Sequence, residues 1–437
     1  MVSEYVVRSI SEEHSEPEWM LRFRLRALKL FYELPEPAWL RGIESLDLEN
    51  IVFHSGPGTR VDSWEDLPED LRRVYERLHI PEQEKEYLAG LSATLDSETV
   101  YSEVADRFRE MGVVLEPMDV AVKKHPDTVR RYFGHIFPVA EHRYAALHYA
   151  LWSGGVFVYV PPGVSLDLPL EAFLYISGEL RGQFEHTLIV ADRGSRLHFI
   201  EGCSAPTFRK PSFHNGAVEV YACEGAHVRF TTVQNWSKNI INFGNKRAVA
   251  ERSALIDWTE GGIGAKVSVV YPSVVLRGAG ARANVCVFSL SHGPYLKDSG
   301  AKIFHAAPGT RSVVTSKGIS GSGGVNIYRG LVRVVKGARN AASHVSCDSL
   351  ILDDWSEVST YPHAQVEEPT ATYTHEATTF RFSEDQLFYL QSRGFDEEQA
   401  KGLAVIGFIQ DVLKGLPLEY ASVLREVLDA DFTGGVG

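Results

Sequence analysis

Gly280-Ala281-Arg282-Ala283 opens one β-rich segment of this chain, and Gly309-Thr310-Arg311-Ser312 and Gly337-Ala338-Arg339-Asn340 open the next two. Three related turns precede them, at Gly194-Ser195-Arg196-Leu197, Gly225-Ala226-His227-Val228 and Arg252-Ser253-Ala254-Leu255. The six turns recur at a nearly constant interval, and a glycine and a small residue repeated with such a period are typical of a solenoid. Because only strands are expected between the turns, we predict a β-helix with one coil per repeat.

The segments between the turns are short runs of alternating apolar residues, such as Phe157-Val158-Tyr159-Val160 and Val218-Glu219-Val220-Tyr221, which are typical of strands. Each coil stacks about 4.8 Å above the last, so that the inward-facing residues fill a continuous core. A β-sandwich with evenly spaced turns is the alternative, but sandwich strands recur at shorter spacing and share no common turn. The fold class that we predict is mainly β, with a parallel β-helix over residues 126–380.

Helices are predicted before the β-helix, in residues 1–125. Ser15 and Glu18 fit a capping box, and apolar residues recur at helical spacing from Trp19 to Glu33. Further helical patterns cover residues 69–78, 81–91 and 97–111. We therefore predict an N-terminal helical domain that caps the solenoid.

A second helical domain is predicted at residues 381–437. Ser383 and Gln386 fit another capping box, and helical patterns follow at residues 397–413 and 418–428. The end of a solenoid needs a cap, and helices would supply it. The same helices could equally form a docking surface for a partner.

The composition excludes several classes of function. The 437 residues include 44 basic and 57 acidic side chains, and a net charge of -13 disfavours nucleic-acid binding. No apolar window approaches the roughly 20 residues of a membrane-spanning helix, and the N-terminus does not resemble a secretory signal. The chain has no G-x-x-x-x-G-K-[ST] loop, so we do not expect it to hydrolyse ATP itself.

The four cysteines, Cys203, Cys223, Cys286 and Cys347, include no C-x-x-C pair. A disulfide framework and a closed structural zinc site are therefore not expected. Four free thiols instead indicate a reducing, cytoplasmic location. Cys347 and His375 are separated by one predicted coil, which predicts that they are neighbours on adjacent coils. A buried cysteine below a hydrogen-bonded histidine is the structural alternative.

With Glu376 beside His375, a thiolate, an imidazole and a carboxylate would converge, and these ligand types suit iron or zinc. Cys203 lies about five coils away, or roughly 25 Å, so the two cysteines should not share a metal. Gly202 and Pro206 flank Cys203 and are expected to expose its thiol, which could then accept sulfur as a persulfide.

Several stretches of this chain resemble the SufB/SufD family, and within it the SufB scaffold subunits of the SUF iron–sulfur cluster assembly system. The stretches that carry this resemblance are Glu201-Gly202-Cys203, Val233-Gln234-Asn235-Trp236, Lys317-Gly318-Ile319-Ser320, Tyr328-Arg329-Gly330-Leu331, Cys347-Asp348-Ser349-Leu350, His375-Glu376-Ala377-Thr378-Thr379 and Asp385-Gln386-Leu387-Phe388-Tyr389. The resemblance extends over nearly the whole chain. It implies a right-handed parallel β-helix between helical domains.

The resemblance also implies roles for individual residues. Cys203 would receive sulfur, and Gln234, Trp236 and Lys246 would line the route of that sulfur through the β-helix. A transient cluster, [2Fe–2S] or [4Fe–4S], would be built at a subunit interface with three ligand candidates, which are Cys347, His375 and Glu376. One cysteine per chain cannot hold such a cluster alone, so a partner chain would supply further ligands.

The partners that the resemblance implies are a SufC-type ATPase bound to the C-terminal helices, a SufD-type subunit or second SufB chain bound to the β-helix, and a sulfur-donor protein. The protein would be a scaffold and not an enzyme. Two alternatives stay open, a SufD-like structural subunit without its own cluster site and a β-helix carbohydrate-active enzyme. The sequence does not decide the sulfur donor or any flavin requirement.

Three positions depart from the family pattern. Thr374 stands where the family has a glutamate, which removes one candidate carboxylate ligand. Tyr175 and Ser177 stand where an arginine and an asparagine are thought to assist the sulfur-accepting cysteine.

Overall fold

The computed structural model describes residues 2–44, 46–53, 61, 66, 69, 72, 88–96, 98–206, 208–416, 421, 424 and 425. The helices predicted at 69–78, 81–91 and 418–428 lie largely outside these residues. Among the described residues, no helix combines the length and apolar composition needed to cross a bilayer.

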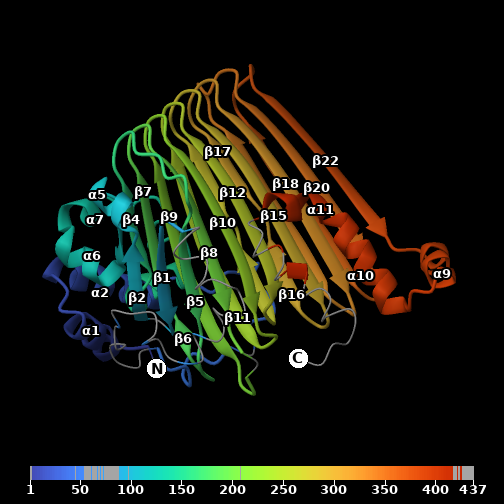
Figure 1. Cartoon of the computed structure of the whole chain (residues 1–437), viewed down its shortest axis with the longest axis horizontal. Helices are drawn as coiled ribbons and strands as arrows, with labels where there is room; N and C mark the ends of the chain where they lie inside the picture. Colours follow the sequence, from blue (N-terminus) through green and yellow to red (C-terminus); the bar gives the residue numbers. More distant parts are fainter. Residues whose placement is uncertain are drawn as a thin grey trace.

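Two mainly parallel sheets form a β-solenoid of about eight coils, as the repeated turns predicted (Figure 1). The order of the ten-stranded sheet is β2 (Glu98–Val104), β1 (Gly90–Leu95), β5 (Leu170–Tyr175), β8 (Arg196–Ser204), β10 (His227–Trp236), β12 (Leu255–Gly264), β15 (Arg282–His292), β18 (Arg311–Gly321), β20 (Ala342–Ile351) and β22 (Thr372–Arg381). Only the pairing of β1 with β2 is antiparallel in this sheet.

The order of the second, twelve-stranded sheet is β13 (Val267–Val270), β16 (Leu296–Ser299), β19 (Val325–Val334), β17 (Lys302–His305), β14 (Ser273–Leu276), β11 (Ile240–Ala250), β9 (Ser212–Ala222), β7 (His186–Ala191), β4 (Val156–Val160) and β3 (Val114–Pro117). Two more strands join it off this path, with β21 (Glu357–Val366) beside β19 and β6 (Gly182–Gln183) beside β9. The last coil therefore consists of β21 and β22, and in the described chain no strand lies beyond them.

The turns confirm the repeat but not every coil length. At Gly225 and Gly309 φ is 69 and 66, a left-handed conformation that glycine adopts without steric cost. Strand β18 starts in register with β15, as Arg311 pairs with Arg282, the residue at the same place in the preceding turn. The last two coils are longer than the predicted average, because Ala342 pairs with Arg311 and Thr372 pairs with Ala342.

Alternate residues of every coil point into the space between the two sheets, which we call the lumen. One half of the lumen is an apolar core of small and branched side chains, such as Val228, Ile256 and Ala283. The other half is lined by polar side chains and carries the candidate site described below.

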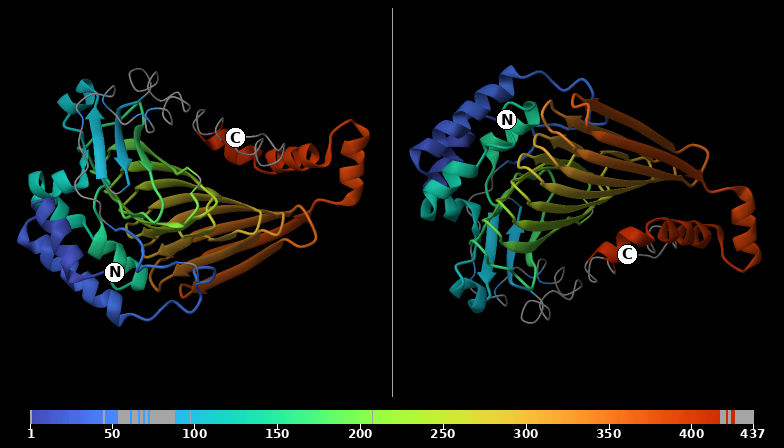
Figure 2. Two further views of the ribbon diagram at one scale, coloured as in Figure 1. Left: turned by 90° about the horizontal axis from the view of Figure 1, so that it is seen from below. Right: turned by 90° about the horizontal axis from the view of Figure 1, so that it is seen from above.

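Helices cover the outer faces of both sheets. The helices are α1 (Glu4–Glu13), α2 (Glu18–Glu33), α5 (Asp106–Glu110), α6 (Met118–Lys124), α7 (Pro126–Tyr132), α8 (Arg143–Leu151), α9 (Glu384–Ser392), α10 (Glu397–Phe408) and α11 (Gln410–Gly415). The N-terminal helices pack on the twelve-stranded sheet, whereas α10 and α11 run back along the ten-stranded sheet (Figure 2). His14, which ends α1, contacts the buried carboxylates of Asp119 in α6 and Glu98 in β2.

The helix predictions were partly confirmed. The helix over 19–33 is α2, and Ser383 and Gln386 make the predicted capping box at α9. The first capping box is wrong, because α2 begins at Glu18 with Pro17 as its N-cap and no side-chain cap. The helix predicted at 97–111 is also wrong, because β-forming residues there build β2 before the short α5.

Candidate functional site

Cys203 lies in β8 with its side chain in the lumen, where only 2% of its surface is exposed. The prediction that Gly202 and Pro206 expose the thiol is wrong, because β8 continues to Ser204 and is paired with β5 and β10 on either side. Burial raises the pKa of the Cys203 thiol well above its ordinary value, and the charge of Glu201 adds to that rise.

Lys246 forms the centre of a buried ion-pair network beside Cys203. Its Nζ lies 2.9 Å from Glu201 Oε1 and 3.2 Å from Glu260 Oε1, and Gln234 Nε2 donates to the same Glu260 oxygen at 3.1 Å. Burial lowers the pKa of the Lys246 ammonium, but the charges of Glu201 and Glu260 outweigh burial and raise it. Burial also raises the pKa of Glu260 to about 7, against the opposing charge of Lys246.

The four residues predicted to handle sulfur thus lie together. Gln234 is the register neighbour of Cys203, Trp236 packs in the same apolar cluster, and the charge of Lys246 lowers the pKa of the thiol. Tyr175, one of the departures from the family pattern, pairs with Ser204 beside Cys203. A single buried site therefore contains the thiol, an ammonium, two carboxylates and an amide.

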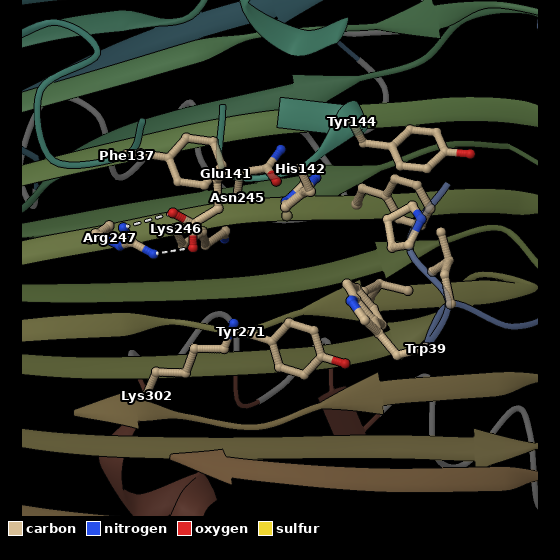
Figure 3. A pocket seen from close by; sticks show the side chains of 15 residues that line it. Trp39, Phe137, Glu141, His142, Tyr144, Asn245, Lys246, Arg247, Tyr271 and Lys302 are labelled. Carbon is tan, nitrogen blue, oxygen red and sulfur yellow. Dashed lines mark hydrogen bonds and ion pairs between the residues drawn. The ribbon is translucent and has the colours of Figure 1, made fainter. Parts of the chain in front are cut away.

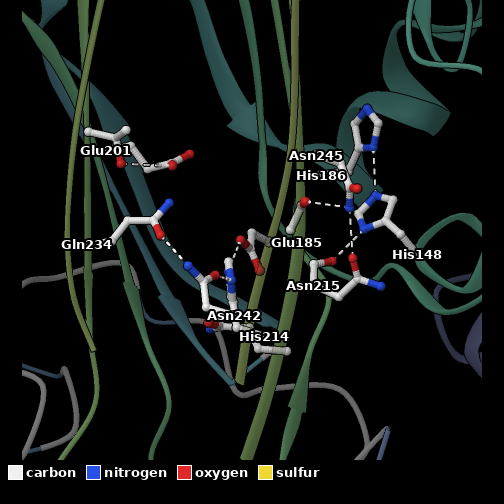
Figure 4. A network of polar contacts seen from close by, with 12 residues as sticks. His148, Glu185, His186, Glu201, His214, Asn215, Gln234, Asn242 and Asn245 are labelled. Carbon is white, nitrogen blue, oxygen red and sulfur yellow. Dashed lines mark hydrogen bonds and ion pairs between the residues drawn. The ribbon is translucent and has the colours of Figure 1, made fainter. Parts of the chain in front are cut away.

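Three further residues extend this network and were missed by sequence reasoning. Gln234 Oε1 accepts from Asn242 Nδ2 at 2.5 Å, and Asn242 Oδ1 lies 2.6 Å from His214 Nδ1. His214 Nε2 lies 2.5 Å from Glu185 Oε1 (Figure 4). His214 and Asn242 are one coil apart in register, so the coil period was a signal that could have paired them.

Polar side chains continue along the lumen toward Cys347. In the twelve-stranded sheet, His214, Asn242, Ser268, Lys297 and Asn326 occupy one row of register neighbours. Asn242 Nδ2 donates to Ser268 Oγ at 2.9 Å, which links two steps of the row. The lumen therefore holds a polar row that extends over most of the coils between the two cysteines.

Cys347 lies in β20, five strands from β8, as predicted, and its side chain is also buried in the lumen. It shares a hydrogen bond with the phenol of Tyr328. Burial raises the pKa of the Cys347 thiol to about 11, whereas the bond to Tyr328 lowers it. A Cβ at Gly330 would lie 2.8 Å from Tyr328 Cε1, so glycine leaves the space that the phenol ring needs.

The predicted convergence is found only in part: Cys347 and His375 lie on the adjacent strands β20 and β22 but two residues out of register, and Glu376 points away from them. The register partner of Cys347 is Ala377, and His375 pairs with Val345 instead, because this coil is longer than the predicted repeat. His375 faces the lumen side of β22, whereas Glu376 points to the outer face, 3.6 Å from His344. The described residues contain no cluster of three or more His, Cys, Asp or Glu side chains placed to hold a metal ion.

A second buried network anchors the N-terminal helices to the solenoid. His148 Nε2 lies 3.0 Å from His186 Nδ1, and His186 Nε2 lies 3.2 Å from Glu219 Oε2. In Figure 4, His148 and His186 lie apart from His214 and Gln234. Because Glu219 also accepts backbone N–H groups from residues 134, 136 and 137, we assign this network a structural role.

A small pocket on the outer face of the twelve-stranded sheet has its charges already engaged. Arg247 Nη2 lies 2.8 Å from Glu141 Oε1, and Lys302 Nζ lies over the ring of Tyr271 (Figure 3). Burial lowers the pKa of His142 in the same pocket to about 4. Lys246, the centre of the lumen network, also lines this pocket, so the two sites share one residue.

Comparison with known proteins decides the family. A family model described as "SUF system FeS cluster assembly, SufBD core domain" matches residues 174–408, and one described as "SufBD protein N-terminal region" matches residues 91–172. The chain belongs to the SufBD family.

Among curated relatives, iron–sulfur cluster assembly SufBD family proteins of Staphylococcus aureus strain MRSA252 and Staphylococcus epidermidis strain ATCC 12228 are each 41% identical to this chain. The protein of Staphylococcus aureus strain USA300 is 40% identical. Each match covers 100% of this chain and 94% of the relative. This SufBD protein is thus a component of iron–sulfur cluster assembly in the SUF system, which favours that role over a carbohydrate-active enzyme.

The C-terminal helices of this SufBD protein are joined to the strand of Cys347 by Lys317. The Lys317 ammonium lies 4.6 Å from the ring centroid of Phe408 in α10 and 3.3 Å from Asp348 Oδ2, next to Cys347. Beyond this contact, α9 buries none of its side chains and leaves Phe388 and Tyr389 exposed. The Lys317 contact adds to an apolar cluster in which Val405 and Ile409 of the C-terminal region pack on the ten-stranded sheet.

Proposed function

We propose that this SufBD protein is a cytoplasmic scaffold on which iron–sulfur clusters are assembled de novo. In this proposal Cys203 accepts sulfur from a donor protein, and Gln234, Trp236 and Lys246 line the first part of its route. The cluster is the cargo, and it is built near Cys347 and passed to acceptor proteins. The observation that carries the proposal is that both cysteines face one lumen and are separated by a mostly polar row of side chains.

We infer that the cluster forms where the last coil meets another chain. Strands β21 and β22 are each ten residues long and mostly exposed, and a long bare edge strand is a ready template for pairing with another chain. His375 faces the lumen side of this coil and its buried Nε2 has no hydrogen-bond partner in the described part of the chain. A SufD-type subunit or a second copy would cover these edges and add the ligands that one cysteine lacks.

Glu376 is the weakest of the three ligand candidates, because it faces the side of β22 opposite to Cys347. The proposal therefore rests on Cys347 and His375. Glu376 would reach the same iron only across the surface of a partner chain.

We infer that a SufC-type ATPase binds the exposed surface of α9 and its neighbours. The chain has no phosphate-binding loop of its own, and Lys317 provides a contact between α10 and the strand of Cys347. Deletion of residues 383–437 should abolish binding of the ATPase in a pull-down with the purified subunits. Retained binding would contradict this assignment.

The scaffold proposal is tested by anaerobic reconstitution with the partner subunits. Cys347→Ala should abolish the visible absorbance of the cluster together with its bound iron and acid-labile sulfide. Cys286→Ala is the matched control, because it removes a partly buried thiol from the outer face of β15. Unchanged cluster content in Cys347→Ala would refute the proposal.

A SufD-like structural role is the second candidate. The absence of a converging ligand set in the described residues and the presence of Thr374 favour it. Iron and sulfide analysis of the anaerobically purified complex separates the two candidates, because a structural subunit would bring no cluster that depends on its own Cys347.

A further inference from the structure

Arg282 and Arg311 form a pair of like charges on the outer face of the ten-stranded sheet. The two residues open strands β15 and β18 and are partners in register, so their side chains leave the sheet about 4.8 Å apart. Both side chains are exposed. Because like charges directly opposite each other on adjacent strands destabilise a sheet, this arginine pair lowers the stability of the isolated chain.

Other exposed arginines of the solenoid are balanced by a carboxylate one coil away. Such ion pairs join Arg252 with Glu224, Arg277 with Glu251, Arg333 with Glu367 and Arg381 with Asp354. Arg282 and Arg311 depart from this pattern, since neither guanidinium forms an ion pair or a hydrogen bond with any residue that the structure describes. Balanced pairs would keep this surface solvated equally well, so the unbalanced pair points to an anionic group on another molecule.

One carboxylate stands close to the arginine pair in the sheet register, and it is already engaged. Asp257 lies two residues beyond Leu255, the register partner of Arg282. Asp257 Oδ1 accepts from Asn284 Nδ2 at 2.7 Å, and its Oδ2 lies 2.6 Å from His227 Nε2. Both oxygens of Asp257 therefore have partners other than the arginines.

The sheet surface around the arginine pair is bare in the described chain. Helices α10 and α11 pack on the carboxyl-terminal halves of the strands, through residues such as Ile319 and Leu350. At the opening end of β18, Val313 points to the same side as Arg311 and is 44% exposed. A partner could therefore reach both the arginine pair and an apolar side chain beside it.

The chemistry of the pair favours carboxylates on a protein. A guanidinium group binds carboxylates and phosphates through two parallel hydrogen bonds. The whole chain carries a net charge of -13, which repels the continuous charge of a nucleic acid. A protein with a local group of carboxylates meets much less of this repulsion.

The spacing of the pair matches carboxylates one turn apart on a helix. Residues at positions i and i+4 of a helix have Cβ atoms about 5–6 Å apart, whereas residues on one face of a strand are about 6.6 Å apart. A third exposed arginine continues the line, because Gly309, two residues before Arg311, donates its N–H to Arg339 O at 2.8 Å. A helix lying along the solenoid axis would meet these arginines in succession.

We propose that Arg282 and Arg311 dock an acidic helix of a partner protein, which places two carboxylates one turn apart over the two guanidinium groups. Val313 would contact an apolar side chain of the same helix. This surface is separate from the lumen and from the C-terminal helices. The inference therefore does not depend on the proposed function, and either one can fail without the other.

The probe is an alanine-based peptide longer than about 15 residues, a length at which such peptides become helical. One peptide carries glutamates at positions i and i+4 on one face, and a matched peptide carries glutamines there. Binding of each labelled peptide to the full chain is measured by fluorescence anisotropy. The glutamate peptide should bind and the glutamine peptide should not, and added salt should weaken binding because it screens exposed charges.

Substitution of the pair tests the assignment of residues. Arg282→Gln together with Arg311→Gln should raise the dissociation constant of the glutamate peptide about tenfold, the combined effect of two exposed ion pairs. Arg252→Gln together with Arg277→Gln is the matched control, because it removes two exposed arginines and changes the net charge equally. The control should stay within about twofold of the unsubstituted chain, since distant exposed charges are screened.

A second measurement needs no peptide. Arg311→Gln relieves the repulsion within the pair, so it should raise the thermal midpoint at low salt by up to about 1 °C. Arg252→Gln breaks an ion pair and should not raise the midpoint. A midpoint of Arg311→Gln at or below that of the unsubstituted chain would refute the repulsion on which the proposal rests.

Three binding results would also overturn the proposal. The first is that the unsubstituted chain does not bind the glutamate peptide. The second is that both double variants lose the same affinity, which would show only a general effect of net charge. The third is that a single-stranded oligonucleotide of equal charge binds more tightly than the glutamate peptide, which would make the arginine pair a phosphate site.

Discussion

Replacing Lys246 by methionine should destabilise the protein strongly, and more so as the pH rises. The ammonium is buried between Glu201 and Glu260, at 2.9 and 3.2 Å. Removing one partner of a buried ion pair leaves uncompensated charge and costs roughly 3–5 kcal/mol. For Lys246→Met at pH 8 we therefore expect a loss of about 4 kcal/mol in the free energy of unfolding.

The pH dependence follows from Glu260. The pKa of Glu260 is about 7 in the folded protein, above its ordinary value of 4.5. Between pH 4.5 and pH 7, therefore, the folded protein holds a proton on Glu260 that the unfolded chain has lost. The contribution of Glu260 to stability is therefore highest below pH 4.5 and falls as the pH rises through 7. Without Lys246 the pKa rises further, so Lys246→Met should lose about 1.4 kcal/mol less at pH 6 than at pH 8.

Urea unfolding followed by circular dichroism at both pH values measures the two losses. Lys401→Met is the control, because Lys401 also contacts two carboxylates, at 2.7 and 3.4 Å, but they lie on an exposed helix face. Such surface pairs contribute less than about 1 kcal/mol. The reasoning is refuted if Lys246→Met loses no more than Lys401→Met at pH 8, or if its loss is the same at pH 6.

Three further substitutions test other parts of the fold. Burial opposes protonation of His14, but its bonds to the two buried carboxylates outweigh burial and raise its pKa to about 9. The stability that His14 contributes is therefore complete below pH 6.5 and is lost as the pH rises through 9. His14→Gln should cost about 3 kcal/mol in urea unfolding at pH 6 and little at pH 10, and equal losses at the two pH values would contradict this. Gly330→Ala should force the Tyr328 ring away from its position and lower the free energy of unfolding by about 1–3 kcal/mol. Gly262→Ala is the control, because its new Cβ would meet no atom nearer than 3.9 Å. Equal thermal midpoints for the two variants would show that the ring adapts. Ser383→Ala should lower the stability of α9 by about 1 kcal/mol and speed hydrogen exchange of the first-turn amides that the capping box protects. Unchanged exchange would mean that the cap is dispensable.

The sequence allowed the solenoid to be predicted because its turns are local signals. Glycine at the left-handed turn position recurs at Gly225 and Gly309, and the period between such turns measures one coil. The period is an average, however, and register is set by backbone pairing within each coil. Cys347 and His375 were therefore placed on the correct strands but out of register, since Ala377 and not His375 pairs with Cys347.

Burial and helix boundaries were harder to predict because they depend on distant neighbours. Gly202 and Pro206 suggest a broken strand at Cys203, but pairing with strands on both sides keeps β8 intact through Ser204. Ser15 has the composition of a cap, yet the helix starts at Glu18 behind Pro17. Glu185 and His214 lie on adjacent coils of the twelve-stranded sheet, 29 residues apart, so the coil period could have paired them, but neither residue stands in a motif that singled it out.

The variable coil lengths have a practical consequence. Coils of unequal length keep their lumen rows aligned, as the pairings of β12 with β15 and of β18 with β20 show, so the extra residues are accommodated at the turn tips. A short epitope inserted just before Gly194, so that glycine keeps its left-handed turn position with φ 70, should leave the interior chemistry unaltered. The row of turn tips thus provides anchoring points for measuring how far this protein moves when its partners bind.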